Sequence, residues 1–210
     1  MTFTSNRRGW LVLGSAGAAA ALLSLRKGDE RRTEAPTAPE HLPDVPLVTH
    51  DGRNVRFYSD LVQGRIVFIN MMYSHCTNRC PPMTQNLKRV HELLGERVGK
   101  DIFMYSLSLQ PEFDRPQDLR DYMRINDVRA PGWTFLTGAK ADVERVRRSL
   151  GFANRDPEAD ADITQHTGMV RIGNEALDRW CMTPALAEPE LIVGALMGID
   201  PVARAAGRSS

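Results

Sequence analysis

The sequence has little net charge, few cysteines and no internal repeat. Its 210 residues carry a net charge of +1 and include three cysteines. Because the first 32 residues alone hold an excess of four positive charges, the remainder is mildly acidic, which argues against nucleic acid as a partner. The hydrophobic content of 42% suffices for a buried core, so disulfides are not needed to hold the fold together. The length suits one domain with an added tail or targeting segment.

A run of apolar and small residues near the N-terminus, residues 10–25, is short for a membrane-spanning helix, which needs about 20 residues. The run follows Arg7 and Arg8 and resembles a twin-arginine export signal, without a clear cleavage motif after it. We therefore predict that residues 1–25 are an export signal or a membrane anchor. Either outcome places the domain in the periplasm or elsewhere outside the cytoplasm. A buried N-terminal helix is the alternative.

The rest of the chain reads as a linker, a folded domain and a tail. We predict a charged, proline-containing linker over residues 26–41, a domain over 42–198 and a flexible tail over 199–210. Predicted strands cover residues 47–50, 54–57, 66–71, 102–109, 133–136, 167–172 and 177–182. Predicted helices cover residues 80–94, 116–126, 141–150 and 185–197. This order predicts an α/β fold, a thioredoxin-like mixed sheet flanked by helices, with an N-terminal β-hairpin.

Three connecting features accompany these elements. Residues 59–64 are expected to form a short turn, and the polar, acidic residues 152–165 a loop. The basic run formed by Arg145, Arg147 and Arg148 is expected to be a solvated helix face.

Two thiols lie where the central strand is predicted to turn into a helix. The apolar, β-branched residues 66–71 read as a strand buried on both faces. A polar loop follows and ends at Cys80, whose next two residues are prolines, which suit the first turn of a helix. Cys76 and Cys80 therefore occupy a position where ligands and chemistry collect in α/β folds.

The C-x-x-x-C spacing leaves several chemistries open. In an exported protein, Cys76 and Cys80 can form a static disulfide, bind a metal ion or alternate between the two. At a helix N-terminus, Cys80 is expected to have a lowered pKa, because the helix dipole favours the thiolate. Thioredoxin-type redox motifs have two intervening residues rather than three, which weakens a plain oxidoreductase interpretation.

The best candidate for a third metal ligand is His166. It precedes the predicted strand 167–172, whose start lies beside the active-site loop in a thioredoxin-like sheet. Two cysteines and one histidine suit copper(I) through the thiolates and copper(II) through the imidazole, and they also match a zinc site with an open position. On spacing alone, a lone histidine is more often a satisfied or surface residue.

Four short motifs occur in the order found in one known family. They are CTNRCPPM at residues 76–83, SLSLQPEFDRP at 106–116, GWTFLTG at 132–138 and the pair His166-Thr167. Together they resemble the SCO/SenC family, the thioredoxin-like copper chaperones for cytochrome oxidase assembly. The resemblance implies one copper ion per chain, bound by Cys76, Cys80 and His166. It implies a metallochaperone that delivers copper to the copper centre of a respiratory oxidase, or reduces its cysteines, with the oxidase copper-site subunit or another copper carrier as partner.

Some positions depart from the family pattern. Gln110 stands where an aspartate usually precedes the proline, Gln165 stands where an aspartate is frequent, and the segment from Arg171 lacks the usual Asp-Pro-x-Gly turn. These departures indicate a divergent member with a different client or a larger redox role. None of these positions is one of the three copper ligands that the resemblance implies.

Two other functions remain open. The first is an extracytoplasmic thiol-disulfide oxidoreductase or peroxidase that uses Cys76 and Cys80 as a redox-active pair, with Cys80 as the attacking thiolate. The second is a zinc module without redox chemistry. A non-enzymatic copper chaperone is the prediction, and enzymatic turnover is the alternative.

Further side chains are weaker candidates for a role at the site. Asp162 could orient His166, but an exposed loop carboxylate is the simpler interpretation. Thioethers near the thiols could bind copper(I), although methionine there is more often core filling. Cys181 reads as a small buried hydrophobe, His75 as a solvent-side residue, and Tyr73 and Arg79 as surface near the site. The methionines concerned are Met71, Met72 and Met83.

Overall fold

The computed structural model describes residues 41–163 and 168–201. The predicted signal or anchor, most of the linker, His166 and residues 202–210 lie outside these ranges. Within the described ranges no helix is both long and apolar enough to cross a membrane.

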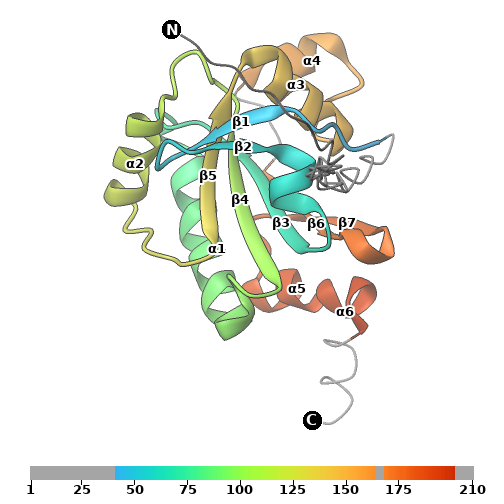
Figure 1. The fold of residues 1–210 in the computed structure, drawn as a ribbon. Coiled ribbons are helices and arrows are strands. Elements are labelled where there is room, and N and C mark those ends of the chain that lie inside the picture. The colour runs from blue at the N-terminus through green and yellow to red at the C-terminus, as the bar shows by residue number, and fades with distance from the viewer. Residues whose placement is uncertain (1–40, 164–167, 202–210) are drawn as a thin grey trace, which may run out of the picture. The chain divides into compact units, whose positions relative to one another are not determined.

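Seven strands form one mixed sheet in the order β2-β1-β5-β4-β3-β6-β7 (Figure 1). Strand β3 pairs in parallel with β4 and antiparallel with β6, so the sheet changes direction beside β3. The predicted N-terminal hairpin is confirmed, since β1 and β2 pair antiparallel. The strands are β1 (Pro46–Thr49), β2 (Asn54–Arg56), β3 (Ile66–Met72), β4 (Ile102–Ser108), β5 (Trp133–Gly138), β6 (Met169–Asn174) and β7 (Arg179–Pro184).

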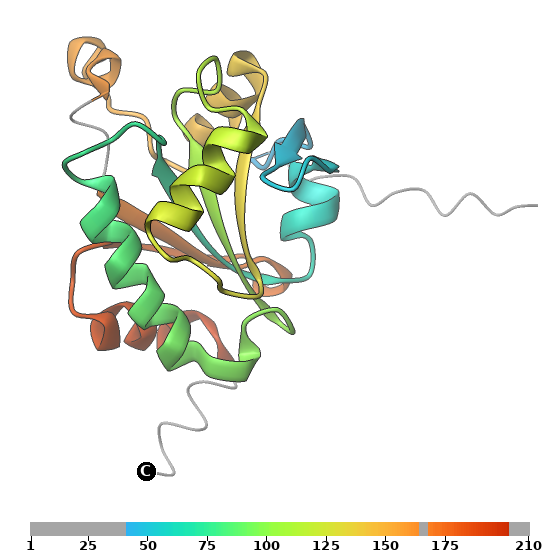
Figure 2. The same cartoon turned by 90° about the vertical axis from the view of Figure 1, so that its left-hand side faces the viewer.

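Helices cover both faces of this sheet (Figures 1 and 2). Helices α1, α2, α5 and α6 pack on one face, and η1 and α3 pack on the other. Every residue of β3 is buried; Phe68 faces the first layer and Ile69 the second, which explains the continuous apolar run in the sequence. The helices are η1 (Phe57–Val62), α1 (Cys80–Leu94), η2 (Gly95–Arg97), α2 (Pro116–Ile125), α3 (Lys140–Ser149), α4 (Pro157–Ala161), η4 (Glu175–Leu177), α5 (Pro189–Gly194) and α6 (Leu196–Ile199).

Three predicted segments differ from the structure. Residues 59–62 of the turn predicted at 59–64 belong to the π-helix η1, which buries Phe57 and Leu61, and only residues 63–64 form a turn. The loop at 152–165 contains helix α4, whose first turn is capped by Asp156 and started by Pro157. The single helix predicted at 185–197 starts only at Pro189, after Pro184 has ended β7, and it is divided into the short helices α5 and α6.

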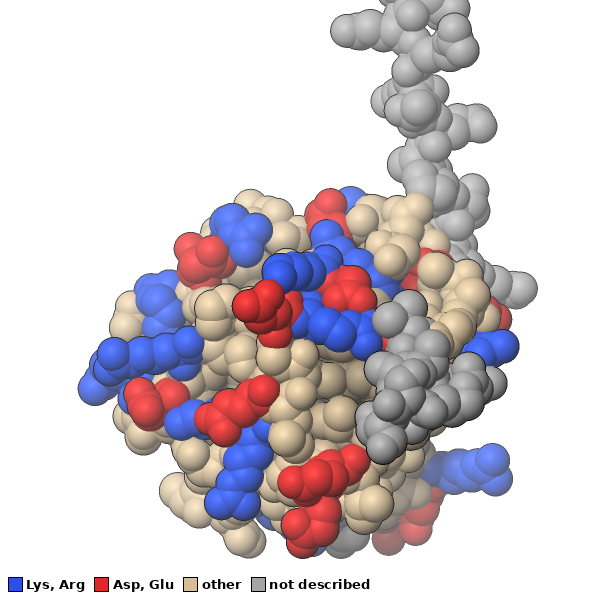
Figure 3. All heavy atoms as spheres, turned by 90° about the horizontal axis from the view of Figure 1, so that it is seen from below, with Lys and Arg blue, Asp and Glu red and all other residues tan. Residues whose placement is uncertain are grey.

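The basic face predicted for α3 is also wrong in one residue. The side chain of Arg147 is only 6% exposed and lies between Glu144 and Asp160, whereas that of Arg145 is 63% exposed. Elsewhere charges of both signs are mixed: on the face in Figure 3, basic and acidic side chains alternate over the surface. That face therefore has no broad basic surface of the kind that binds nucleic acid.

Candidate metal centre

The two predicted site cysteines flank the start of helix α1. Strand β3 ends at Met72, a loop carries Cys76, and α1 begins at Cys80 with proline in its first turn. The start of β6 lies beside the end of β3, because Asn70 pairs with Val170. The sheet register therefore brings the chain after residue 167 to the edge of the sheet where the cysteines lie.

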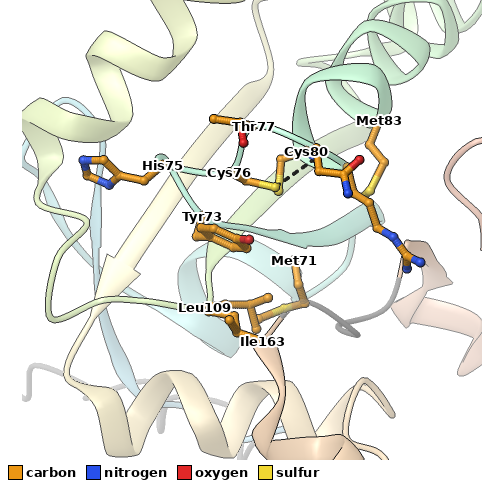
Figure 4. A pocket seen from close by; sticks show the side chains of 11 residues that line it. Met71, Tyr73, His75, Cys76, Thr77, Cys80, Met83, Leu109 and Ile163 are labelled. Atoms are coloured by element: carbon orange, nitrogen blue, oxygen red, sulfur yellow. Dashed lines mark hydrogen bonds between the residues drawn. The ribbon is translucent and has the colours of Figure 1, made fainter.

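Both thiols are free and close together in a cavity of about 230 Å³. Cys76 is 7% exposed and Cys80 is 5% exposed. The backbone N–H of Cys80 donates a hydrogen bond to the sulfur of Cys76 over 3.3 Å, drawn as a dashed line in Figure 4. The cavity is also lined by Tyr73, Met71 and Met83. The site is thus a small, sulfur-rich pocket.

The thiols differ in acidity, and the sequence prediction for Cys80 is wrong. Burial alone would raise the pKa of Cys76, but hydrogen bonds from the backbone and thiol of Cys80 and from the hydroxyl of Tyr73 lower it to about 7. Burial raises the pKa of Cys80 to about 12, and its proximity to Cys76 adds to this effect. The first N–H group of the helix points at the sulfur of Cys76, so the helix N-terminus stabilises that thiolate instead.

Tyr73 is part of the thiol environment. Its hydrogen bond with Cys76, followed by burial and the nearby thiols, raises the tyrosine pKa to about 12. The hydroxyl therefore stays protonated at neutral pH, which is the form that can donate to the sulfur of Cys76.

A buried carboxylate holds the loop that carries Cys76. Asp114, which is fully buried, accepts hydrogen bonds from the backbone N–H and hydroxyl of Ser74 and from the hydroxyl of Ser108. His75 is exposed, as predicted, and its ring lies away from the thiols in Figure 4. The role of Asp114 was missed from sequence, because it depends on β4 and the loop after β3 being adjacent.

The third predicted ligand, His166, lies outside the described residues. Both described ends of that short gap approach the cysteines: Ile163 lines their cavity, and a Cβ atom at Gly168 would lie 3.8 Å from the sulfur of Met83. Among residues 41–163 and 168–201, no three histidine, cysteine or acidic side chains come together in a way that could hold a metal ion. A ligand set of that size would need a residue from outside those ranges.

The weaker candidates fall into two groups. Met71, Met83 and Arg79 line the thiol cavity, whereas Cys181 lies half-buried on β7 and is not part of the cavity lining. The negative charge of Asp162 contributes to raising the pKa of Tyr73, so this carboxylate acts on the site electrostatically. Two lining residues, Leu109 and Ile163, were not singled out from sequence, because apolar residues carry no chemical signature.

The donor set suits soft metal ions. The cavity offers two thiols, one of which is partly ionised near pH 7, together with thioethers in its lining. Such soft sulfur ligands bind copper(I) in preference to hard cations. The same two thiols also suit disulfide exchange, for which a pKa near ambient pH is the optimum.

Comparisons with known proteins agree on one family. The family model described as SCO1/SenC matches residues 34–196. The SCO1 protein homolog of Bacillus subtilis (strain 168) is 25% identical over 126 residues, which is 59% of this chain and 63% of that relative. The chain therefore spans less than two thirds of that relative's length.

Solved structures agree on the fold. Bradyrhizobium japonicum ScoI with copper bound is 24% identical, with a TM-score of 0.56 over 72% of this chain and 94% of that chain. BsSco, described as a member of the Sco family of cytochrome c oxidase assembly proteins with a disulfide switch, is 22% identical, with a TM-score of 0.56 over 77% of this chain and 95% of that chain. These likenesses confirm the predicted thioredoxin-like fold.

Proposed function

Because this chain belongs to the SCO1/SenC family, we propose that it is a metallochaperone that carries one copper ion as its cargo. The ligands in this proposal are the thiolates of Cys76 and Cys80 and the imidazole of His166. The observation that carries it is the pair of free, adjacent thiols in one cavity, approached by the chain on both sides of His166. Relatives described with copper bound, or as oxidase assembly proteins, support it.

Each ligand has a distinct part in the proposed chemistry. Cys76 provides a thiolate near neutral pH, whereas Cys80 stays protonated until the metal ion displaces its proton. His166 adds a nitrogen donor that tolerates copper(II). A client's own thiolates would displace Cys76 and Cys80 one at a time, so copper would pass without being released to water.

The proposed client is the copper-site subunit of a respiratory cytochrome oxidase, or another copper carrier. Delivery of copper is one activity, and reduction of the client's cysteines is the other. In the second, the pair gives up two protons and two electrons to the client disulfide and becomes a Cys76–Cys80 disulfide, which no longer binds copper. We place this activity outside the cytoplasm, with residues 1–25 as signal or anchor.

The alternative function is thiol-disulfide exchange as an enzyme. The pKa of about 7 for Cys76 favours this alternative, since such a thiol is both ionised and nucleophilic at neutral pH. In that case Cys76, rather than Cys80, would be the attacking thiolate. Turnover of a disulfide substrate would then survive loss of His166.

A copper titration of the reduced full chain tests the proposal. We expect one copper per chain by elemental analysis, and an absorption band from copper(II)–thiolate bonding that a zinc site would lack. The Cys76→Ser, Cys80→Ser and His166→Ala variants should lose tight binding. The matched controls Cys181→Ser and His75→Ala remove a thiol and an imidazole outside the proposed ligand set, and should keep it.

Two results would overturn the proposal. If the Cys76→Ser variant holds copper as tightly as the parent, the ligands are misassigned. If the parent retains no copper but its thiols turn over a disulfide substrate, the enzyme alternative is correct.

A further inference from the structure

An ion-pair cluster beside the thiol cavity has no part in the function proposed above. Its centre is Arg147, which together with Val143 and Val146 is one of the three buried residues of α3. A buried guanidinium is costly unless its donors are satisfied. The N–H donors of Arg147 are satisfied by two carboxylates, one on α3 itself and one on α4.

The two carboxylates bind the guanidinium in the same paired manner but come from different places. Glu144, one turn earlier on α3, accepts from Nε at 2.7 Å and from Nη2 at 2.9 Å. Asp160, on α4, accepts from Nη1 at 2.7 Å and from Nη2 at 2.5 Å. Only the pair with Asp160 joins two separate elements.

Helix α4 depends on that pair for its position. It has five residues and buries none of them, so it lacks both the length and the apolar face that stabilise a helix. Asp160 is its best-buried charged group, with a side chain 10% exposed, and it also accepts the backbone N–H of Asn154 at 2.6 Å. The ion pair therefore holds α4 and the preceding loop against α3.

The chain passes directly from this ion pair to the thiol cavity. Ile163 follows Asp160 by three residues and lines the cavity that contains both cysteines. A neighbouring cavity of about 430 Å³ is lined by Arg147 and Asp160 and shares Leu109 and Ile163 with the first. Figure 4 shows Ile163 beside Leu109 at the thiol pocket. A displacement of α4 would move the wall of the pocket.

We infer that Arg147 and Asp160 are positioning residues for the thiol site: their ion pair holds Ile163 in the wall of the cavity that contains Cys76 and Cys80 and thereby maintains the affinity for the metal ion. The inference rests on the proposed copper function for its metal readout. It also has a consequence for the metal-free protein, because a displaced Ile163 would expose the thiols to larger reagents.

The chain offers a matched pair of variants. Asp160→Asn removes the carboxylate charge on α4, whereas Glu144→Gln removes the other carboxylate charge beside Arg147, which lies on α3 itself. Each variant also removes one ion pair of Arg148, with Asp160 at 3.6 Å or with Glu144 at 2.5 Å. Both leave Arg147 with one intact carboxylate partner. A general loss of stability would affect both variants, but a positioning effect would appear only in the first.

Two measurements on the full chain separate these outcomes. In competition with a chromophoric copper(I) chelator, we expect about tenfold weaker binding for Asp160→Asn and unchanged binding for Glu144→Gln. In the metal-free, reduced protein at one fixed pH, Asp160→Asn should speed the reaction of Cys76 with a bulky maleimide more than with iodoacetamide. Arg147→Lys, which keeps the charge but not the paired geometry, should give an intermediate result and replaces Asp160→Asn if that variant does not fold.

The outcomes also distinguish this inference from the proposed function. Parental copper affinity and parental maleimide reactivity in Asp160→Asn would overturn the inference, as would equal losses in Asp160→Asn and Glu144→Gln. A parent chain that binds no copper would overturn the proposed function alone. The selectivity between maleimide and iodoacetamide would then still decide whether the ion pair positions the pocket wall.

Discussion

The backbone N–H of Cys80 donates its hydrogen bond to the sulfur of Cys76 over 3.3 Å. The N-terminus of α1 therefore stabilises a thiolate four residues before it rather than the thiol that it carries. This relationship gives two chemically identical side chains different acidities. Burial leaves Cys80 a poor acid, while Cys76 titrates near neutral pH.

The first prediction concerns the reactivity of the two thiols in the reduced, metal-free chain. Cys76 should react with iodoacetamide at a rate that rises with pH through a midpoint of about 7, because only its thiolate is the nucleophile. Below that pH it is protonated and slow. Cys80 should stay slow across the neutral range, since its pKa is raised to about 12. Mass spectrometry of trapped peptides gives both rates; faster labelling of Cys80 at pH 7 would contradict this assignment.

The second prediction concerns the hydroxyl of Tyr73. Tyr73→Phe removes a hydrogen bond to the Cys76 thiolate, so the pKa of that thiol should rise and the alkylation midpoint should move upward by about one pH unit. Tyr122→Phe is the control, because the hydroxyl of Tyr122 pairs with Thr84 at 2.7 Å rather than with a sulfur. Equal midpoints in the parent and Tyr73→Phe would show that the hydroxyl does not act on the thiolate.

The third prediction concerns the buried carboxylate of Asp114. Asp114→Ala removes the acceptor of the Ser74 backbone N–H and of the buried Ser108 hydroxyl, whereas the Ser74 hydroxyl keeps its contact with Nδ1 of His75. A buried donor without an acceptor costs about 1–3 kcal/mol. Urea unfolding should therefore show a free energy of unfolding lower by at least about 2 kcal/mol. Asp121→Ala is the surface control and should change it by less than about 0.5 kcal/mol. A similar decrease in the free energy of unfolding in both variants would show that Asp114 has no special role in stability.

The fourth prediction concerns two glycines with the same kind of backbone but different surroundings. Gly132 has a φ of +77°, and a Cβ atom there would lie 2.4 Å from the backbone nitrogen of Gly99. Gly52 has a φ of +86°, with nothing within 4 Å of such an atom. Gly52→Ala should lose about 1 kcal/mol from the left-handed backbone alone. Gly132→Ala should lose at least about 2 kcal/mol, since backbone atoms must also move apart. Thermal or urea unfolding checks the order, and equal losses would contradict the close approach.

The central strand, the cysteine loop and the helix after it were predictable because their signals are local. The apolar residues of β3 are buried on both faces, and the prolines after Cys80 mark the first turn of α1. The seven-stranded mixed sheet followed from the alternation of strands and helices. The prediction of one last helix at 185–197 was wrong. The apolar residues after Pro184 suggested a continuous helix, whereas the chain turns after Pro184 and becomes helical only at Pro189.

The amino-acid sequence by itself determined the thioredoxin-like fold, the place of Cys76 and Cys80, and the family to which the chain belongs. Only the tertiary structure decided which thiol is the stronger acid, because that depends on where one backbone N–H points and on how deeply each sulfur is buried. It likewise decided that Arg147 is buried against Asp160 instead of lying on a solvated face. Residue type and spacing specify secondary structure, whereas desolvation and the direction of a hydrogen bond exist only after distant segments have packed together.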